Sequence, residues 1–493
     1  MKKKQASRFL GSFQLPGEQS AVGELRLKGA STLLKLHSDE VLARVEDATN
    51  IEGVSYSGEC ITLIDCLSPG LGRSTFLGGS TRYSADVFPH YVAIGRRHLK
   101  ADDRYIKSIH FTATDLETLF YDFDAFGGVV DSKSIIDVVL QERRKMRPVD
   151  AGEMPQVFYF TGKDCIANIS TEIGRVAVHH RPRYSMGGPS GVFLKNRIVV
   201  TVEPEEPVCF SEAVGRMYDV ASFLSMAAGR TQGIEHIHVS TTEVIENIPV
   251  ALTVHPSYRW KTSSKSEQHK PHPGDVPFNP VQYGAEFASI LSNWISRHND
   301  WRVARLRYLE CMRKVNKYGP ERLVAAANMF DILPTDAVPL AFELPAALAA
   351  TRDECAAMFR KHPAGVDRNG ALSALGRLGK PSLPKKVAHR VEIVDSRLGE
   401  RFPELQFVTN VAVRCRNFFV HGSTSDIDFP KVEPFVPFLT DALEFAFAAS
   451  DFIEAGWDAQ RWNSNLHGWG HGFARFRAGY DIGLAEIKRA TSG

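Results

Sequence analysis

The chain has 493 residues, of which 43% are hydrophobic and 24% are charged, and this composition excludes a wholly disordered protein. Its 59 lysines and arginines nearly balance 57 aspartates and glutamates, which leaves a net charge of +2. This balance excludes a protein that coats nucleic acid through bulk positive charge, but not one with a local basic groove. Because 493 residues are more than usually fold around one hydrophobic core, we expect two or three domains.

The sequence predicts a β-rich fold for residues 1–260. Short runs rich in Leu, Ile and Thr are separated by turn-forming residues, which is typical of antiparallel meanders. Two segments interrupt these runs, 132–146 and 212–228, and in both the apolar residues recur at helical spacing. We therefore expect a sandwich-like antiparallel region that forms either one unit or two subdomains, 1–150 and 151–260.

Residues 261–280 form the clearest boundary in the sequence. They contain four prolines among polar and charged residues, so burial offers little to offset the entropy of ordering them, and we expect a linker or a mobile loop. Beyond them, residues 281–493 show helical periodicity, with amphipathic helices predicted over 405–420 and 436–455 among others. The predicted fold class is α+β, a β-rich region followed by an all-helical bundle.

The seven cysteines and the hydropathy pattern bear on the cellular compartment. The cysteines are scattered, odd in number and without a CxxC pair, so a disulfide framework or a structural zinc site is not expected. The most apolar stretch, 435–453, is interrupted by Asp441, Glu444 and Asp451 and is not expected to span a membrane. The first residues lack the apolar run of a secretory signal, so a cytoplasmic protein is expected.

The segment 411–422, VAVRCRNFFVHG, contains the residues best suited to chemistry. On a helical wheel its apolar residues share one face, whereas Asn417 and His421 lie four residues apart on the other face. In an ideal helix Arg416 lies about 140° from His421. Bringing the two together requires either the length of the arginine side chain or an unwound last turn before Gly422, a natural helix terminator.

The string Arg416-Asn417-x-x-x-His421 resembles the RNxxxH signature of the HEPN superfamily, which includes many metal-independent ribonucleases. The wider layout, with the strands GELRL and ECITLIDCL ahead of a helical bundle, resembles the ApeA-type abortive-infection proteins. This resemblance implies a C-terminal HEPN ribonuclease domain that needs no cofactor or metal. It also implies a homodimer formed through the bundle, with two copies of the motif in one cleft.

These residue types suit RNA cleavage by attack of the 2′-hydroxyl group. An imidazole such as that of His421 can take up or deliver a proton near neutral pH, and a helix C-terminus favours its protonated form. The guanidinium of Arg416 can bind phosphate oxygens as a permanently charged fork. Asn417 can orient the imidazole or hold the phosphate. Since one histidine cannot be acid and base at once, pairing two bundles makes chemical sense.

A structural alternative accounts for the same motif. Asn417 and His421 could hydrogen-bond to each other on a solvated helix face, with Arg416 in a surface ion pair. A matching rival function is a non-catalytic protein that binds a ligand or partner through its β-rich region and dimerises through a HEPN bundle.

Basic residues outside the motif are candidates for contacts with the RNA backbone, because phosphate contacts dominate nucleic-acid affinity. Some lie in a basic helix predicted over 294–317, although an ordinary solvated helix face is the favoured explanation of that segment. Others lie in a proline-containing stretch, 376–390, which is predicted to be a loop. The candidates are Arg414, Lys385, Lys386 and Arg305. An acidic residue that orients the catalytic pair could come from an earlier helix, as Asp353 or Glu354. Periodicity leaves open which of the two faces inward, if either, and a surface role is the favoured alternative.

The function expected from the resemblance is that of an anti-phage abortive-infection effector. Such a protein stays inactive until infection and then cleaves RNA. The β-rich region would sense a phage-derived trigger or restrain the nuclease, and no residue in 1–260 identifies its ligand.

Overall fold

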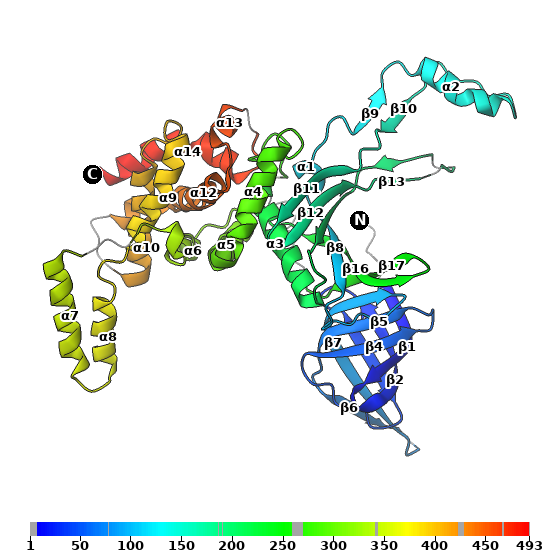
Figure 1. The fold of residues 1–493 in the computed structure, drawn as a ribbon, viewed down its shortest axis with the longest axis horizontal. Coiled ribbons are helices and arrows are strands. Elements are labelled where there is room, and N and C mark those ends of the chain that lie inside the picture. Colours follow the sequence, from blue (N-terminus) through cyan, green and yellow to red (C-terminus); the bar gives the residue numbers. More distant parts are fainter. Residues whose placement is uncertain are drawn as a thin grey trace. The chain divides into compact units, whose positions relative to one another are not determined.

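The computed structural model describes residues 7–76, 78–185, 187–189, 191–258, 270–340, 344–422, 428–465 and 468–492. Contacts divide the chain into two compact units, which Figure 1 shows coloured by sequence. The first, here called the β-rich unit, comprises Met1–Leu224, Gln232–Thr262 and Asn279–Ile295. The second, the helical unit, comprises Ser225–Thr231, Ser263–Phe278 and Ser296–Gly493.

Six antiparallel strands of the β-rich unit close into a barrel. The strand order is β7-β3-β2-β1-β4-β5, and β5 pairs with β7 again, so the sheet has no free edge along this path. Side chains alternate between a buried and an exposed face, as in β4, and the inward residues form an apolar core. The barrel strands are β1 (Ser7–Leu15), β2 (Gln19–Leu27), β3 (Leu33–Ser38), β4 (Thr49–Ser55), β5 (Cys60–Leu67) and β7 (Thr81–Gly95).

The same sheet continues beyond the barrel from β7. The added strands follow the order β17-β16-β8-β15-β12-β11, with antiparallel pairing throughout, and β6 (Leu71–Thr75) also pairs with β7. Helix α3 (Phe210–Ala228), which was expected over 212–228, is largely buried. The bounds are β8 (Ile106–Ala113), β11 (Cys165–Thr171), β12 (Gly174–His180), β15 (Ile198–Glu203), β16 (Ile234–Ile245) and β17 (Ile248–Pro256).

Smaller elements complete the β-rich unit. Helix α2 (Lys133–Arg144) occupies the segment predicted to be helical at 132–146, and α4 (Gly284–Ser296) buries its apolar side chains, such as Phe287 and Trp294. The remaining elements are α1 (Leu116–Leu119), β9 (Phe126–Val129), which pairs with β10 (Val157–Phe160), and β13 (Arg183–Tyr184), which pairs with β14 (Leu194–Lys195).

The helical unit is built around α12 (Val436–Ala455). Most of its side chains are buried, because α6, α9, α10 and α14 all pack against it. Helices α7 and α8 pack against each other as a hairpin, which Figure 1 shows in yellow-green. The other helices are α5 (His298–Arg313), α6 (Pro320–Asp331), α7 (Ala346–Arg360), α8 (Val366–Leu375), α9 (Leu383–Leu398), α10 (Leu405–His421), α11 (Phe429–Val432), α13 (Ala459–Ser464) and α14 (Gly472–Thr491).

The predicted fold class is confirmed: a β-rich region precedes an all-helical one. Within it the strands curl into a closed barrel, where a sandwich-like packing was expected. Part of the predicted linker, 261–269, lies outside the described residues. Its remainder packs against the helical unit, because Phe278 stacks edge-on against Phe452 and Asp275 accepts the backbone N–H groups of Gly468 and Gly470. Among the described residues, no helix combines the length and apolar character that a membrane span needs.

Candidate functional site

Helix α10 carries the sequence motif at its C-terminal end. Its apolar face is buried in the bundle through residues such as Val408, Val411 and Cys415, which leaves the motif residues on the opposite side. The helix stays regular to His421 and ends at Gly422, whose left-handed φ of 62° and N–H bond to the carbonyl of Phe418 form the C-cap.

Arg416 and His421 lie together at this end of α10. Arg416 Nη1 is 3.5 Å from His421 Nε2, at the outer limit of a hydrogen bond, and donates a hydrogen bond of 3.1 Å to Asn417 Oδ1. Since the last turn is not unwound, the length of the arginine side chain brings the two groups together. His421 is exposed, whereas Arg416 exposes only 15% of its side chain. The pair therefore combines a held guanidinium with a solvent-accessible imidazole.

The guanidinium is held from a second helix. Asn328 on α6 accepts hydrogen bonds at its Oδ1 from Arg416 Nε, at 3.2 Å, and from Arg416 Nη2, at 2.9 Å. Asp331, one turn later on α6, places Oδ2 3.9 Å from Arg416 Nη2. Neither residue is predicted from the sequence, because nothing in their local pattern indicates that α6 packs beside α10.

Lys386 on α9 joins this cluster through Asp331. Its Nζ donates to the Asp331 carbonyl at 2.9 Å and lies 3.4 Å from Asp331 Oδ1. Lys385 beside it is exposed, and Arg414 is half-buried on α10. The prediction of a loop at these lysines is wrong: both lie in the first turn of α9, where a proline is compatible with a helix.

Arg305, a candidate for RNA binding, does not lie where it could contact RNA. The predicted helix 294–317 is broken at Arg297, and within α5 the Arg305 side chain is fully buried. Its Nε and Nη2 donate to the two carboxylate oxygens of Asp451, each at 2.9 Å. A guanidinium buried in such an ion pair presents no surface to RNA, so its role is in the helical core.

Two other sequence candidates fall on α7. Asp353 and Glu354 are both exposed, and Asp353 pairs with its neighbour Arg352 at 2.8 Å. The carboxylate that lies against Arg416 is instead that of Asp331.

Among the described residues around the motif, neither a reactive thiol nor a set of metal ligands is present. Burial raises the pKa of the Cys415 thiol to about 11, so this group stays protonated and points into the core. Within the described part of the chain, no three His, Cys, Asp or Glu side chains are grouped so that they could hold a metal ion.

Taken together, the cluster can bind an anion and move a proton at adjacent atoms. Two carboxamide oxygens and one carboxylate fix the guanidinium, which leaves its outer edge next to the imidazole. A phosphodiester oxygen bound at Arg416 would lie within reach of His421.

Comparison with known proteins addresses the β-rich region. The family described as ApeA N-terminal domain 1 matches residues 8–294, from β1 into α4, and the comparison identifies no HEPN domain. No curated protein and no solved structure matches the chain. Since the family match covers more than half of the sequence, the chain belongs to the ApeA family.

Proposed function

We propose that the protein is a HEPN-type endoribonuclease that acts in defence against phage. The observation that carries the proposal is the 3.5 Å approach of Arg416 Nη1 to an exposed His421 Nε2 at the end of a bundle helix. Membership of the ApeA family supports the defence role. The RNA substrate and a metal-independent reaction follow from the resemblance of the motif to HEPN ribonucleases.

The proposed reaction is internal transfer at a phosphodiester. The 2′-oxygen loses its proton and bonds to phosphorus, the bond from phosphorus to the 5′-oxygen breaks, and that oxygen gains a proton. The products are a 2′,3′-cyclic phosphate and a 5′-hydroxyl group. Arg416 stabilises the charge on the phosphate oxygens, and His421 exchanges a proton with one of the two hydroxyl oxygens. Asn417 acts on Arg416, because its side-chain oxygen accepts a bond from that guanidinium.

A homodimer would supply the second acid–base group. One imidazole cannot both accept and deliver a proton in the same step, so a second His421 from a partner bundle completes the proposed site. Arg414 and Lys385, which are at least partly exposed, would contact the RNA backbone on either side. The reaction would take place in the cytoplasm, where RNA is available.

The test is incubation of the full-length protein with total RNA in the presence of EDTA, followed by mapping of 2′,3′-cyclic phosphate ends. We expect His421→Ala to lower cleavage at least about a hundredfold, the usual contribution of a general acid or base. His362→Ala, which changes an exposed histidine just beyond the end of α7, is the matched control and should cleave normally. A folded His421→Ala protein with full activity would exclude this function.

The second candidate function is a non-catalytic binding protein whose helical bundle only dimerises. It is favoured by the family match, which ends at residue 294 and identifies no nuclease domain. In this second function the β-rich unit would bind a small ligand or a partner, whereas in the nuclease it would sense a phage-derived trigger. Expression of wild type and of His421→Ala during infection distinguishes them, because only the nuclease predicts a difference in RNA integrity.

A further inference from the structure

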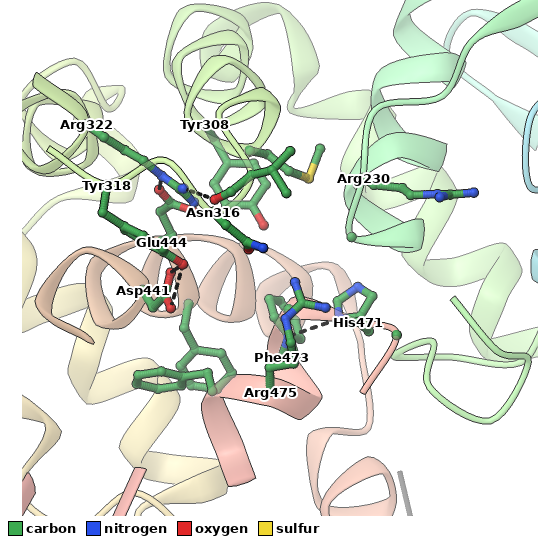
Figure 2. A pocket seen from close by; sticks show the side chains of 17 residues that line it. Arg230, Tyr308, Asn316, Tyr318, Arg322, Asp441, Glu444, His471, Phe473 and Arg475 are labelled. Atoms are coloured by element: carbon green, nitrogen blue, oxygen red, sulfur yellow. Dashed lines mark hydrogen bonds and ion pairs between the residues drawn. The ribbon is translucent and has the colours of Figure 1, made fainter. Parts of the chain in front are cut away.

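A separate cavity of about 80 Å³ lies inside the helical unit (Figure 2). Its walls come from the residues just after α3, from the end of α5 and the segment that follows it, from α6 and α12, and from the start of α14 with the residues just before it. A water molecule needs about 10–15 Å³ of such space, so the cavity has room for roughly half a dozen waters or a ligand of similar size. None of the motif residues of α10 lines it.

Tyr308 presents an unused hydroxyl group to this cavity. The residue is only 6% exposed, and its ring stacks on Phe447 with centroids 5.7 Å apart. Its hydroxyl makes no hydrogen bond to any residue that the structure describes, and burial raises its pKa, so the group stays a neutral donor. Because this hydroxyl faces the cavity and has no partner among the described residues, it can donate a hydrogen bond to a polar ligand bound there.

The charges around the cavity sum to a positive value. Arg322 neutralises Glu444 through two hydrogen bonds, of 2.8 and 2.9 Å, so this pair contributes no net charge. Burial and the neighbouring Glu444 raise the pKa of Asp441 to about 7, so at neutral pH this carboxyl group is only partly ionised. Arg475 also lines the space, and its full positive charge exceeds the partial negative charge of Asp441.

The donors converge on one region of the cavity. Figure 2 shows Tyr308 and Asn316 entering from one side and Arg475 and His471 from the other. Arg475 Nη1 is fixed by a 2.9 Å bond to the carbonyl of Trp469. Arg475 also belongs to the first turn of α14, where the helix dipole favours a negative charge.

We propose that this cavity is a binding site for a phosphate group, with the Tyr308 hydroxyl and the Arg475 guanidinium as its donors. The size fits a phosphate ion or the phosphate end of a small ester, and the surplus of cations disfavours an amine. The site does not depend on the nuclease activity, since it shares no residue with the Arg416–His421 cluster.

Calorimetric titration of the full-length protein with inorganic phosphate tests the site, and glycerol phosphate in a second arm distinguishes the free ion from an ester. We expect saturable binding that weakens at least about tenfold in Tyr308→Phe, the loss of one hydrogen bond to a charged group. Arg475→Gln should weaken it further. Arg489→Gln, at the exposed far end of the same helix, is the matched control and should bind as wild type does.

Thermal unfolding at matched ionic strength gives an independent measurement, because a ligand that binds only the native state raises Tm. The phosphate-induced rise should be smaller in Tyr308→Phe than in Arg489→Gln. Absence of saturable binding to wild type would overturn the proposal, as would equal binding by all variants. Stronger stabilisation by methylammonium than by phosphate would overturn the assigned charge.

Discussion

Asn328 is the residue that holds Arg416 in place from a neighbouring helix. Its single oxygen accepts from two nitrogens of the guanidinium, at 3.2 and 2.9 Å, so the planar group cannot turn about its own axis without breaking a bond. In the proposed nuclease Asn328 is therefore a positioning residue, which acts on the reaction through Arg416.

Asn328→Ala is expected to lower RNA cleavage by roughly ten- to a hundredfold, because a hydrogen bond to a charged group contributes about 1.5–3 kcal/mol. Asn328→Asp should restore most of the activity, since a carboxylate oxygen can accept the same bonds. Single-turnover rates and KM measured for both variants check this. A rise in KM alone, with kcat unchanged, would contradict a positioning role.

Arg416→Lys separates charge from shape at the same site. Lysine keeps the positive charge but lacks the planar fork that contacts Asn328, Asn417 and the phosphate together. We expect cleavage to fall by at least about tenfold, a loss equivalent to one such interaction. Arg302→Lys, at an exposed position of α5, provides the control for general charge effects on RNA binding. Equal activity of Arg416→Lys and wild type would show that only charge matters.

Two glycines of the helical unit differ in backbone conformation, and alanine is therefore expected to have opposite effects on stability at the two positions. Gly422 caps α10 with φ of +62°, and a Cβ there would meet no atom within 4 Å, so alanine would add only backbone strain. Gly479 lies inside α14 with equally open space around it.

Gly422→Ala should lower the free energy of unfolding by about 1 kcal/mol, the penalty of a left-handed conformation for a residue with a Cβ. Gly479→Ala should raise it by about 0.5–1 kcal/mol, because alanine is the better helix former. Urea denaturation of both variants and wild type measures the two effects. The same sign of change in both would contradict this explanation of the helix end.

Asp441 gives α12 a pH-dependent contribution to stability. Its folded-state pKa, about 7, is raised above the ordinary value of 3.8 by burial and by Glu444, so the folded protein holds a proton that the unfolded chain releases. This contribution is fully present below the ordinary value and is lost as the pH rises through about 7.

Asp441→Asn removes this titration while keeping an oxygen that accepts from Tyr318. Between mildly acidic and neutral pH, the unfolding free energy of wild type should fall relative to that of the variant by at most about 1.4 kcal/mol per pH unit. Urea denaturation across this range measures the difference. Asp481→Asn, which removes an exposed carboxyl group on α14, is the control, and its unfolding free energy should change with pH in parallel with that of wild type. Parallel curves for Asp441→Asn would show that this group is ionised throughout.

At the scale of the whole molecule, the core of the barrel depends on residues from all six strands. Leu34 on β3 is fully buried there, whereas Leu10 on β1 is 53% exposed. Leu34→Ala should lower the unfolding free energy by about 2–5 kcal/mol through lost burial and an unfilled cavity. Leu10→Ala should change it by less than about 0.5 kcal/mol. Guanidinium denaturation compares the two, and equal effects would contradict the barrel core described here.

Features carried by local spacing could be predicted from the sequence. The apolar repeat of α10 and α12 indicated both helices. The approach of Arg416 to His421 was expected from the resemblance of the motif and the length of the arginine side chain, since helix spacing alone places the two about 140° apart. The contacts of Asn328 and Asp331 could not be predicted, because they depend on how α6 packs against α10. Arg305 was misassigned for the same reason: its partner Asp451 lies 146 residues away, and a buried arginine looks like an exposed one in sequence.

Closure of the barrel could not be predicted from the sequence either, because it requires β7 to pair with both β3 and β5. Alternating apolar residues are common to sandwiches and barrels, and only the long-range pairing distinguishes them.

The 15-residue strand β7 has a practical consequence for dissecting the protein. It is bonded to β3 and β5 in the barrel wall and to β17 outside it, while β8 depends on β15 and β16, which follow much later in the chain. A fragment that stopped at residue 150 would retain β7 and β8 but lack their three later neighbours, β15, β16 and β17, which would expose unpaired backbone along two strands. Such a fragment would be prone to aggregation, so the β-rich unit is best produced with residues 7–295 intact, including α4.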